Sequence, residues 1–356
     1  MERKPRVLYL YAGSRKHFYE EWKKGLVADT QLLGQNHMSD LGIDAEFKEF
    51  QISELLRKIN FNLVHLPYLS ILRRYDVVFI CAGLPLVFAA KKIFGWKKPR
   101  FVIYNTSLTN ALLRNKRGFA RHILVRAISA LDSIVCTATE QADFLKKEGF
   151  DPEKIVVRPI GIDPAPFLAH DDTYPDIDTP FIVSVGRDLG RDYATLFEAV
   201  RELPIKVVVA TKPEAVLGLT PPPNVEIRFN VPYSEMPKLY RKALFAVTPL
   251  RDATNPNGSD TSGQYGFLEP MAAGRAVIVS DRSTVHDYLE HEKSALLVPP
   301  GNPTALRGAI EELIRDSAKR DRLALAGREA VRERYTSTQF ARELARIFQR
   351  LADTRV

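Results

Sequence analysis

The apolar and polar positions of this chain repeat one order, a short apolar run followed by a longer amphipathic stretch. The first apolar run, residues 7–11, predicts a buried strand, and a helical pattern follows it from residue 14 to about residue 41. Further strands are predicted at residues 45–50, 76–81, 100–104, 134–137 and 155–157. Strand-then-helix order indicates a parallel sheet that helices cover on both faces.

A second series of the same kind follows a segment rich in proline and aspartate, residues 163–180, which predicts an interdomain linker. Its strands are predicted at residues 181–186, 206–210, 225–229, 244–248 and 276–280, and its last helical patterns at residues 303–332 and 336–351. The fold class is therefore α/β, with two doubly wound Rossmann-like domains. We expect them to face a cleft, because ligands of such sheets bind beyond the carboxyl ends of the strands.

The expected domains are an N-terminal domain at residues 1–163, a C-terminal domain at residues 164–335, and a final helix at residues 336–356 that packs back on the first domain. With 356 residues, 45% of them hydrophobic and 26% charged, the chain is long enough for two such domains.

Cysteine usage and hydropathy bear on the compartment. Cys81 and Cys136 lie in apolar strand-like runs, so neither a disulfide framework nor a zinc site is predicted, and a reducing, cytoplasmic compartment is favoured. The longest apolar stretches fall short of the ~20 residues that cross a bilayer, and residues 1–6 do not have the pattern of a signal peptide.

The net charge of +8 is uneven, and the basic excess lies in the first half of the chain. Basic clusters at residues 91–92, 97–100 and 114–126 are interleaved with apolar side chains. A solvated basic surface and a face for anionic lipid head groups, on the inner side of a membrane, or for an anionic acceptor fit this pattern equally well. Nucleic acid is not an expected partner, because no nucleic-acid-binding module accompanies the charge.

Residues 259–281 carry the most informative motif. They predict a polar loop with glycines, a short amphipathic helix, a glycine stop and a buried strand. Gly263 and Gly266 let backbone amides approach a ligand, and the helix directs its free N–H groups at it, which suits an anion. Glu269, one turn later, can accept hydrogen bonds from neutral hydroxyls such as a ribose diol. The alternative is an ordinary helix start in an α/β domain.

Two arginines follow the first strand of the second series. Arg187 stands at the end of that strand, and Arg191 comes four residues later, so both cations can reach one anion. Guanidinium groups stay charged and bind oxygens in pairs, which suits a diphosphate. The alternative is that Arg187 pairs with Asp188 or Asp192 at the surface.

Four segments, residues 157–167, 185–191, 244–249 and 263–280, together resemble a known family. The chain is similar to retaining nucleotide-sugar glycosyltransferases of the GT-B fold, of family four type, the glycosyl transferases group 1. The resemblance implies a nucleoside diphosphate sugar as co-substrate, with UDP the first choice and GDP the second. It implies no further cofactor and no metal. Asp176 and Asp178 match an Asp-x-Asp metal pattern but stand among prolines, where a metal site is not expected.

The resemblance also implies roles for residues. Arg187 and Arg191 would hold the diphosphate and act in catalysis, and Glu269 would bind the ribose. Donor contacts are implied for Gly13, Arg187, Arg191, Val231, Asp260, Thr261, Ser262, Gly263, Gln264, Tyr265, Gly266 and Glu269.

Two positions depart from the family pattern. Thr261 stands where relatives carry the first glutamate of Glu-x7-Glu, and Asn105 stands where many have a histidine after a first-domain strand. Asn105 is the third catalytic candidate, and His17 and His37 are weaker substitutes. A protein base is not required if the diphosphate accepts the proton of the acceptor during front-face attack.

The leading hypothesis is transfer of a hexose or acetamido sugar to a hydroxyl of a glycan or lipid-linked acceptor. The domain at residues 164–335 would bind the nucleotide sugar, and the basic domain at residues 1–163 would bind the acceptor. The second is a non-catalytic relative that binds a nucleotide sugar or a partner. The third is a dehydrogenase, which needs Gly-x-Gly-x-x-Gly after the first strand, and residues 12–17 do not supply it.

Overall fold

The computed structural model describes residues 3–11, 13–59, 63–81, 83, 95–168, 180–252 and 263–354. The chain divides into two compact units. Unit 1 consists of Met1–Lys23, Asp29–Pro159 and Ser337–Val356, and unit 2 consists of Lys24–Ala28 and Ile160–Thr336. Each unit has its own sheet.

The sheet of unit 1 is parallel and has the strand order β2-β1-β3-β4-β5-β6. Its strands are β1 (Arg6–Leu10), β2 (Asp44–Phe47), β3 (Val77–Ile80), β4 (Arg100–Tyr104), β5 (Ser133–Cys136) and β6 (Ile155–Val157). Its helices are α1 (Lys16–Lys23), α2 (Gln51–Ile59), α4 (Leu108–Arg114), α5 (Phe119–Ser129), α6 (Thr139–Lys147) and α13 (Ser337–Asp353). The predicted strands are confirmed to within a few residues.

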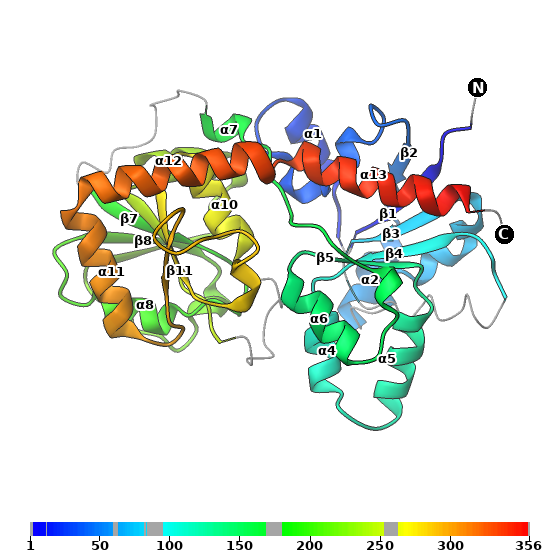
Figure 1. Ribbon diagram of the computed structural model, residues 1–356, viewed down its shortest axis with the longest axis horizontal. Coiled ribbons are helices and arrows are strands. Elements are labelled where there is room, and N and C mark those ends of the chain that lie inside the picture. Colours follow the sequence, from blue (N-terminus) through cyan, green and yellow to red (C-terminus); the bar gives the residue numbers. More distant parts are fainter. Residues whose placement is uncertain are drawn as a thin grey trace. The chain divides into compact units, whose positions relative to one another are not determined.

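The two faces of this sheet are covered by different helices. Leu8, Val78 and Ile103 belong to a core cluster that also contains side chains of α4, α5 and α6. The alternate positions point to the other face, where Phe79 of β3 packs edge-on against Phe348 of α13, with ring centroids 5.4 Å apart. The last helix of the chain therefore completes the core of unit 1, as Figure 1 shows.

The helix predicted from residue 14 to residue 41 is wrong. Helix α1 ends at Lys23, and two short 3-10 helices, η1 (Asp29–Leu32) and η2 (Gln35–His37), follow. Gly25 and Gly34 adopt φ angles of 70° and 80°, in the left-handed region that an α-helix cannot contain. The apolar residues of this stretch are buried by tertiary packing and not by one continuous helix.

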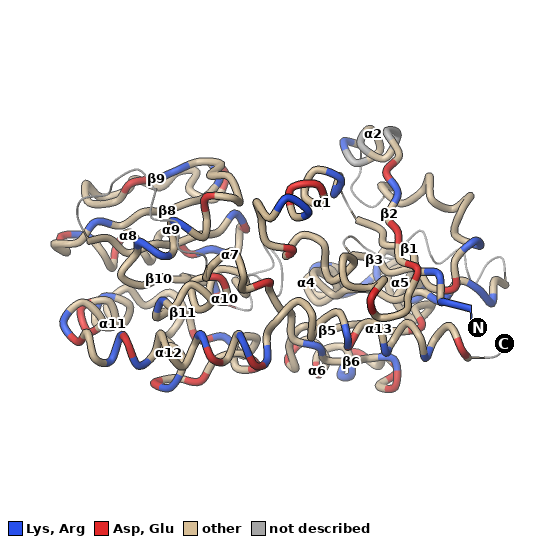
Figure 2. The backbone as a smooth tube through the Cα atoms, turned by 90° about the horizontal axis from the view of Figure 1, so that it is seen from above, with Lys and Arg blue, Asp and Glu red and all other residues tan. Residues whose placement is uncertain are grey.

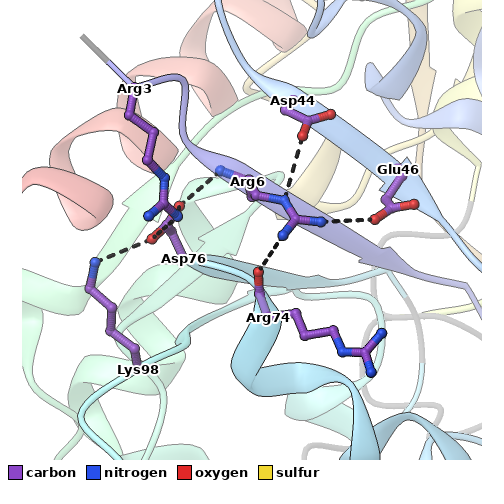
Figure 3. A network of polar contacts seen from close by, with 7 residues as sticks. All are labelled: Arg3, Arg6, Asp44, Glu46, Arg74, Asp76 and Lys98. Atoms are coloured by element: carbon purple, nitrogen blue, oxygen red, sulfur yellow. Dashed lines mark hydrogen bonds and ion pairs between the residues drawn. The ribbon is translucent and has the colours of Figure 1, made fainter.

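A polar network ties the amino ends of β1, β2 and β3 together (Figure 3). The Asp76 carboxylate accepts hydrogen bonds from the Arg6 backbone N–H at 3.0 Å and from Lys98 Nζ at 3.2 Å. Arg100 in turn donates to Asp132 at 3.0 Å. Two cations of the cluster at residues 97–100 therefore pair with neighbouring carboxylates, and Arg121 of the cluster at residues 114–126 pairs with Glu148. The cluster predicted at residues 91–92 lies outside the described residues.

The sheet of unit 2 is also parallel, with the order β12-β11-β10-β7-β8-β9. Its strands are β7 (Phe181–Val185), β8 (Lys206–Thr211), β9 (Val225–Phe229), β10 (Phe245–Thr248), β11 (Ala276–Ser280) and β12 (Leu296–Val298). Its helices are α7 (Ala165–Leu168), α8 (Tyr193–Val200), α9 (Met236–Lys242), α10 (Gln264–Ala272), α11 (Pro303–Arg315) and α12 (Ser317–Arg334). Strand β12 is not among the predicted strands, although β6, which is equally short, is.

Helices α8 and α11 cover one face of this sheet, and α10 and α12 lie on the other (Figure 1). The single helical pattern predicted at residues 303–332 is two helices, because Asp316 ends α11 and caps the start of α12 by accepting from the Lys319 N–H at 2.8 Å. Positive and negative positions alternate along α11 and α12 (Figure 2). Among the described residues, no helix is long and apolar enough to cross a membrane.

Candidate active site

The start of α10 forms the centre of the candidate site in unit 2. The helix follows the carboxyl end of β10, and its N-cap, Gly263, has a φ angle of 110° that only glycine adopts without strain. Thr248 at the end of β10 donates to the Gly266 carbonyl at 2.9 Å and fixes the first turn against the sheet. The first-turn N–H groups of α10 therefore lie at the edge where doubly wound sheets bind ligands.

Arg191 reaches the same place and is almost completely buried, with 5% of its surface exposed. Three glycines make room for its side chain. A Cβ atom on Gly186 would lie 1.8 Å from Nε, one on Gly266 would lie 2.6 Å from Nη2, and one on Gly263 would lie 3.3 Å from Nη1. The glycines that the sequence suggested for a ligand thus also admit this guanidinium.

The guanidinium of Arg191 has unused hydrogen-bonding capacity. Within the part of the chain that the structure describes, Nε and Nη1 are buried and have no hydrogen-bond partner. A buried cation without acceptors is costly, and such a group is retained where a ligand supplies the acceptors. Together with the adjacent helix start, these two donors have the chemistry that suits an anion.

Glu269 lies behind the first turn of α10 and is 6% exposed. Burial raises the pKa of its carboxyl to about 7, although the Tyr240 hydroxyl and the charge of Arg191 both act to lower this pKa. The Tyr240 hydroxyl donates to Oε2 of Glu269 at 3.2 Å. Sequence reasoning missed Tyr240, because no motif marks a tyrosine on α9, 29 residues before its partner.

The second arginine is oriented by a different loop. Nη2 of Arg187 donates to the Val231 carbonyl at 2.7 Å, and its guanidinium lies 5.2 Å from the centre of the Tyr233 ring. Asn230, just before this loop, adopts a φ angle of 53°. The structure therefore brings Arg187 and Val231 together, as two neighbouring parts of the predicted donor site.

The turn between β7 and α8 is fixed from both sides. The Gly186 carbonyl accepts from the Thr211 hydroxyl at 2.6 Å and from the Tyr193 hydroxyl at 2.8 Å. Asp192, the residue after Arg191, caps α8 by accepting from the N–H of Thr195 at 3.2 Å. The backbone on both sides of Arg191 is thus held before any ligand arrives, which is the preorganisation that electrostatic stabilisation requires.

The remaining unit 2 candidates lie either in the first turn of α10 or outside the described residues. Gln264 and Tyr265 lie in the first turn of α10. Asp260, Thr261 and Ser262 lie outside the described residues, as do Asp176 and Asp178 of the metal pattern.

In unit 1 the structure places Asn105 in the core, fully buried after β4. Its Oδ1 accepts from the Leu108 N–H at 3.0 Å at the start of α4, and its Nδ2 lies 3.6 Å from the sulfur of Cys136. His17 is exposed and lies 3.2 Å from Glu21, and His37 lies 2.8 Å from Asp29.

Gly13 follows β1 in unit 1. A Cβ atom there would meet one atom of the described residues within 4 Å, Nη1 of Arg15 at 3.9 Å, so the protein itself leaves this position open.

Two Rossmann-like units, each with a six-stranded parallel sheet flanked by helices, have the architecture of the GT-B class of fold. Family models match both halves of the chain, Glycosyltransferase Family 4 over residues 44–166 and Glycosyl transferases group 1 over residues 175–330. The chain belongs to the group 1 glycosyltransferases.

Curated relatives match parts of the chain. Phosphatidyl-myo-inositol mannosyltransferase of Mycobacterium leprae is 35% identical over 97 residues, which are 27% of this chain and 26% of that protein. Lipopolysaccharide core biosynthesis glycosyltransferase LpsD of Rhizobium meliloti is 24% identical over 62% of this chain and 64% of its own length. The matched region thus spans less than two thirds of each relative.

Solved structures agree with the fold along nearly the whole chain. Sucrose-phosphate synthase of Thermosynechococcus elongatus has a TM-score of 0.69 at 17% identity, over 98% of this chain and 99% of its own. HepE of Anabaena, in complex with UDP and glucose, has a TM-score of 0.69 at 14% identity, over 97% of this chain and 100% of its own. At these identities the likeness establishes the GT-B fold alone.

Proposed function

We propose that this chain transfers a hexose or acetamido sugar from a nucleoside diphosphate sugar to a hydroxyl group of a glycan or lipid-linked acceptor. UDP is the proposed carrier before GDP, the anomeric configuration is retained, and no metal ion takes part. The observation that carries the proposal is the buried Arg191 guanidinium, with two unpaired donors beside the start of α10. The complexes of HepE with UDP and glucose support the choice of UDP.

Arg191 would act on the leaving group. As the bond from the sugar to the diphosphate breaks, negative charge grows on the diphosphate oxygens. A fixed guanidinium and aligned helix N–H groups stabilise that charge more in the transition state than in the bound donor. Because these positive groups come from the protein, the proposed reaction needs no metal ion to neutralise the diphosphate.

The other side chains of the site would bind the nucleoside. Arg187, held by the Val231 carbonyl, directs a second cation toward the diphosphate from the loop proposed to lie near the base. Glu269 would take the ribose hydroxyls. Its neutral and ionised forms both accept hydrogen bonds, and the ionised form accepts the stronger ones.

The test replaces Arg191 by alanine. We expect turnover of UDP-sugar hydrolysis or transfer to fall about 100-fold, the usual effect of removing one donor to a developing oxyanion. Arg228→Ala is the matched control, because Arg228 lies on β9 and pairs with Glu226. Near-normal turnover of both Arg187→Ala and Arg191→Ala would remove the diphosphate site from the proposal.

A second candidate function, nucleotide-sugar binding without catalysis, is favoured by Thr261 in place of the usual first glutamate. A thermal-shift panel of UDP- and GDP-sugars, followed by hydrolysis assays of each stabilising compound, separates the two. Stabilisation by UDP together with a persistent lack of hydrolysis and transfer would select the binding function.

We propose further that the acceptor is carried on an anionic membrane that helix α5 contacts. Phe119 and Ile123, one turn apart on α5, are 79% and 37% exposed. Arg114, Lys116 and Arg117 precede them, and apolar side chains beside cations suit an anionic lipid surface. The names of both curated relatives refer to lipid-borne molecules, phosphatidyl-myo-inositol and lipopolysaccharide, which supports such an acceptor.

Flotation with vesicles tests this contact. We expect the protein to float with anionic vesicles at low salt and to lose this binding in Phe119→Ser. Leu217→Ser is the matched control, since Leu217 is 85% exposed in unit 2. Equal flotation with neutral and anionic vesicles would contradict the membrane proposal and leave the transferase proposal unaffected.

A further inference from the structure

A cavity lies within unit 1, at the carboxyl ends of β1 and β2. Its volume is about 280 Å³, slightly below the roughly 300–1,000 Å³ of pockets for drug-sized ligands. The walls come from the residues after β1, from the end of β2, from the start of α2 and from the 3-10 helix η4 (Leu66–Ser70). Gly13 also lies on this wall. The cavity therefore has room for about one monosaccharide ring.

One side of the cavity is aromatic. Tyr11 and Phe47 pack edge-to-face with ring centroids 5.9 Å apart, and Phe50 and Tyr68 do the same at 4.9 Å. The Tyr11 hydroxyl donates to the Leu32 carbonyl at 2.6 Å, and the Tyr68 hydroxyl donates to the Lys48 carbonyl at 2.7 Å. Because both tyrosine hydroxyls are used within the protein, this side offers a ligand mainly ring surface, much of it from the half-buried Phe47 and Phe50.

The other side holds the carboxylate of Glu49, which caps the start of α1. Oε1 accepts from the backbone N–H groups of Arg15 at 2.6 Å and Lys16 at 3.0 Å. Oε2 accepts from the Ser14 hydroxyl at 3.0 Å. Burial raises the pKa of Glu49, but these hydrogen bonds outweigh it and hold the pKa below its ordinary value. Glu49 is thus an ionised hydrogen-bond acceptor at neutral pH and a poor proton acceptor.

The aromatic wall and the ionised Glu49 carboxylate together favour one chemical class of ligand. An aromatic wall takes the apolar face of a ring, and an ionised carboxylate takes hydroxyl donors at its edge. Lys48 also lines the cavity, but its ammonium pairs with Glu46 at 3.6 Å, so a phosphate group would meet mainly the Glu49 charge. An acyl chain would leave the Glu49 carboxylate without a new partner. A neutral sugar ring has both an apolar face of C–H groups and hydroxyls around its edge.

We propose that the cavity binds a neutral pyranose, the sugar ring of the acceptor that receives the transferred sugar. This assignment of the acceptor rests on the proposed transferase function. The binding itself does not, because it depends on side chains of unit 1 alone. The acceptor is accordingly a glycan or glycolipid that presents an uncharged sugar.

The experiment is saturation-transfer NMR on the full chain with methyl glycosides of glucose, mannose, galactose and N-acetylglucosamine. We expect saturation of the ring C–H protons of at least one glycoside. Phe47→Leu and Phe50→Leu, which keep an apolar side chain but remove the ring, should each weaken its binding about fivefold. Glu49→Gln should weaken it about tenfold.

Glu140→Gln is the control for Glu49→Gln. Glu140 is a second carboxylate at the start of a unit 1 helix, because it lies in the first turn of α6. Unchanged glycoside binding in this control is expected, and an equal loss in both variants would overturn the role of Glu49. Binding that survives both phenylalanine substitutions would overturn the proposed site, as would the absence of binding by all four glycosides.

UDP binding is measured on the same samples. Stabilisation by UDP without any glycoside binding would overturn the acceptor site and leave the transferase proposal standing. Glycoside binding without any response to UDP or GDP would overturn the transferase proposal, because the protein would not bind the proposed donor. The sugar-binding cavity would remain.

Discussion

Arg191 shows how closely single residues decide the candidate chemistry. Its guanidinium fits only because three positions around it, Gly186, Gly263 and Gly266, carry no side chain. The effect of a substitution at any of these positions therefore depends on how far it displaces the Arg191 side chain, and not on helix or strand propensity.

Gly266→Ala follows from this geometry. The new Cβ would lie 2.6 Å from Nη2 of Arg191 and 3.2 Å from the Val185 carbonyl oxygen. The end of a flexible side chain moves more easily than backbone, so we expect a folded protein with a displaced guanidinium. UDP-dependent thermal stabilisation should be largely lost, and the free energy of unfolding should fall by no more than about 1–3 kcal/mol.

The control is Gly308→Ala in α11, where a Cβ would meet nothing within 4 Å of the described residues. Alanine at this helical position should add about 0.5–1 kcal/mol of stability and leave UDP binding unchanged. Normal UDP binding by Gly266→Ala would mean that Arg191 does not hold the anion.

The raised pKa of Glu269 predicts that the free energy of unfolding falls as the pH rises toward 7. Its pKa is about 7 in the folded protein, against about 4.3 in an unfolded chain. Between these two values the folded state binds the proton more tightly, so the contribution of this group to stability is greatest below pH 4 and is lost as the pH rises through 7. The full difference is about 4 kcal/mol.

Urea unfolding of the parent protein and of Glu269→Gln, from pH 5 to pH 8, measures this contribution. The glutamine side chain does not titrate, so the variant should gain stability relative to the parent as the pH rises, and the gain should level off above pH 7. A difference that does not change with pH would mean that Glu269 is ionised in the folded state. The variant should also bind UDP more weakly at pH 8, where the parent carboxylate accepts from the ribose hydroxyls.

At the scale of elements, strands were easier to predict than the turns between them. The buried strand β4 is an almost continuous apolar run, whereas the edge strand β9 alternates apolar and charged residues, and the pattern found both with their bounds. The helix predicted over the stretch after α1 is interrupted at Gly25 and Gly34, and the second of these glycines is placed by a contact with a distant segment. Gly34 lies against Ala341 of α13, 307 positions further along the chain.

The same limit applies to the site. Arg187, Arg191, Val231 and the start of α10 follow from motifs close to strand ends. Tyr240 and the aromatic cavity of unit 1 come from side chains that meet only after several elements have packed, and local spacing carries no sign of such meetings.

Gly34→Ala tests the packing between η2 and α13. The new Cβ would lie 3.0 Å from the Ala341 Cβ and 3.2 Å from its Cα, at a backbone with φ of 80°. Strain at positive φ costs roughly 1–2 kcal/mol, and displacement of α13 costs about as much again. Gly42→Ala carries only the first cost, because Gly42 has a φ of 77° and nothing within 4 Å. Equal losses of unfolding free energy in the two variants would contradict a close η2–α13 contact.

At the scale of the whole molecule, the two units have separate hydrophobic cores, and the chain enters unit 1 twice. Helix α13 returns to the sheet of unit 1 after unit 2 is complete, and its Phe348 packs against Tyr9 and Phe79. The stability of unit 1 therefore depends on the last residues of the chain, whereas the candidate anion site depends on unit 2 alone.

Calorimetry should resolve this division of roles. Phe348→Ala removes a fully buried ring and should destabilise unit 1 by about 3–5 kcal/mol, while Leu313→Ala, in the core of unit 2, should cost that unit about 2–5 kcal/mol. We expect each substitution to lower a different unfolding transition. A ligand stabilises the state that binds it, so UDP should raise the transition that Leu313→Ala lowers, in the parent and in Phe348→Ala alike. If UDP instead raised only the transition sensitive to Phe348→Ala, the nucleotide would bind unit 1, and the assignment of the donor to Arg191 and α10 would be wrong.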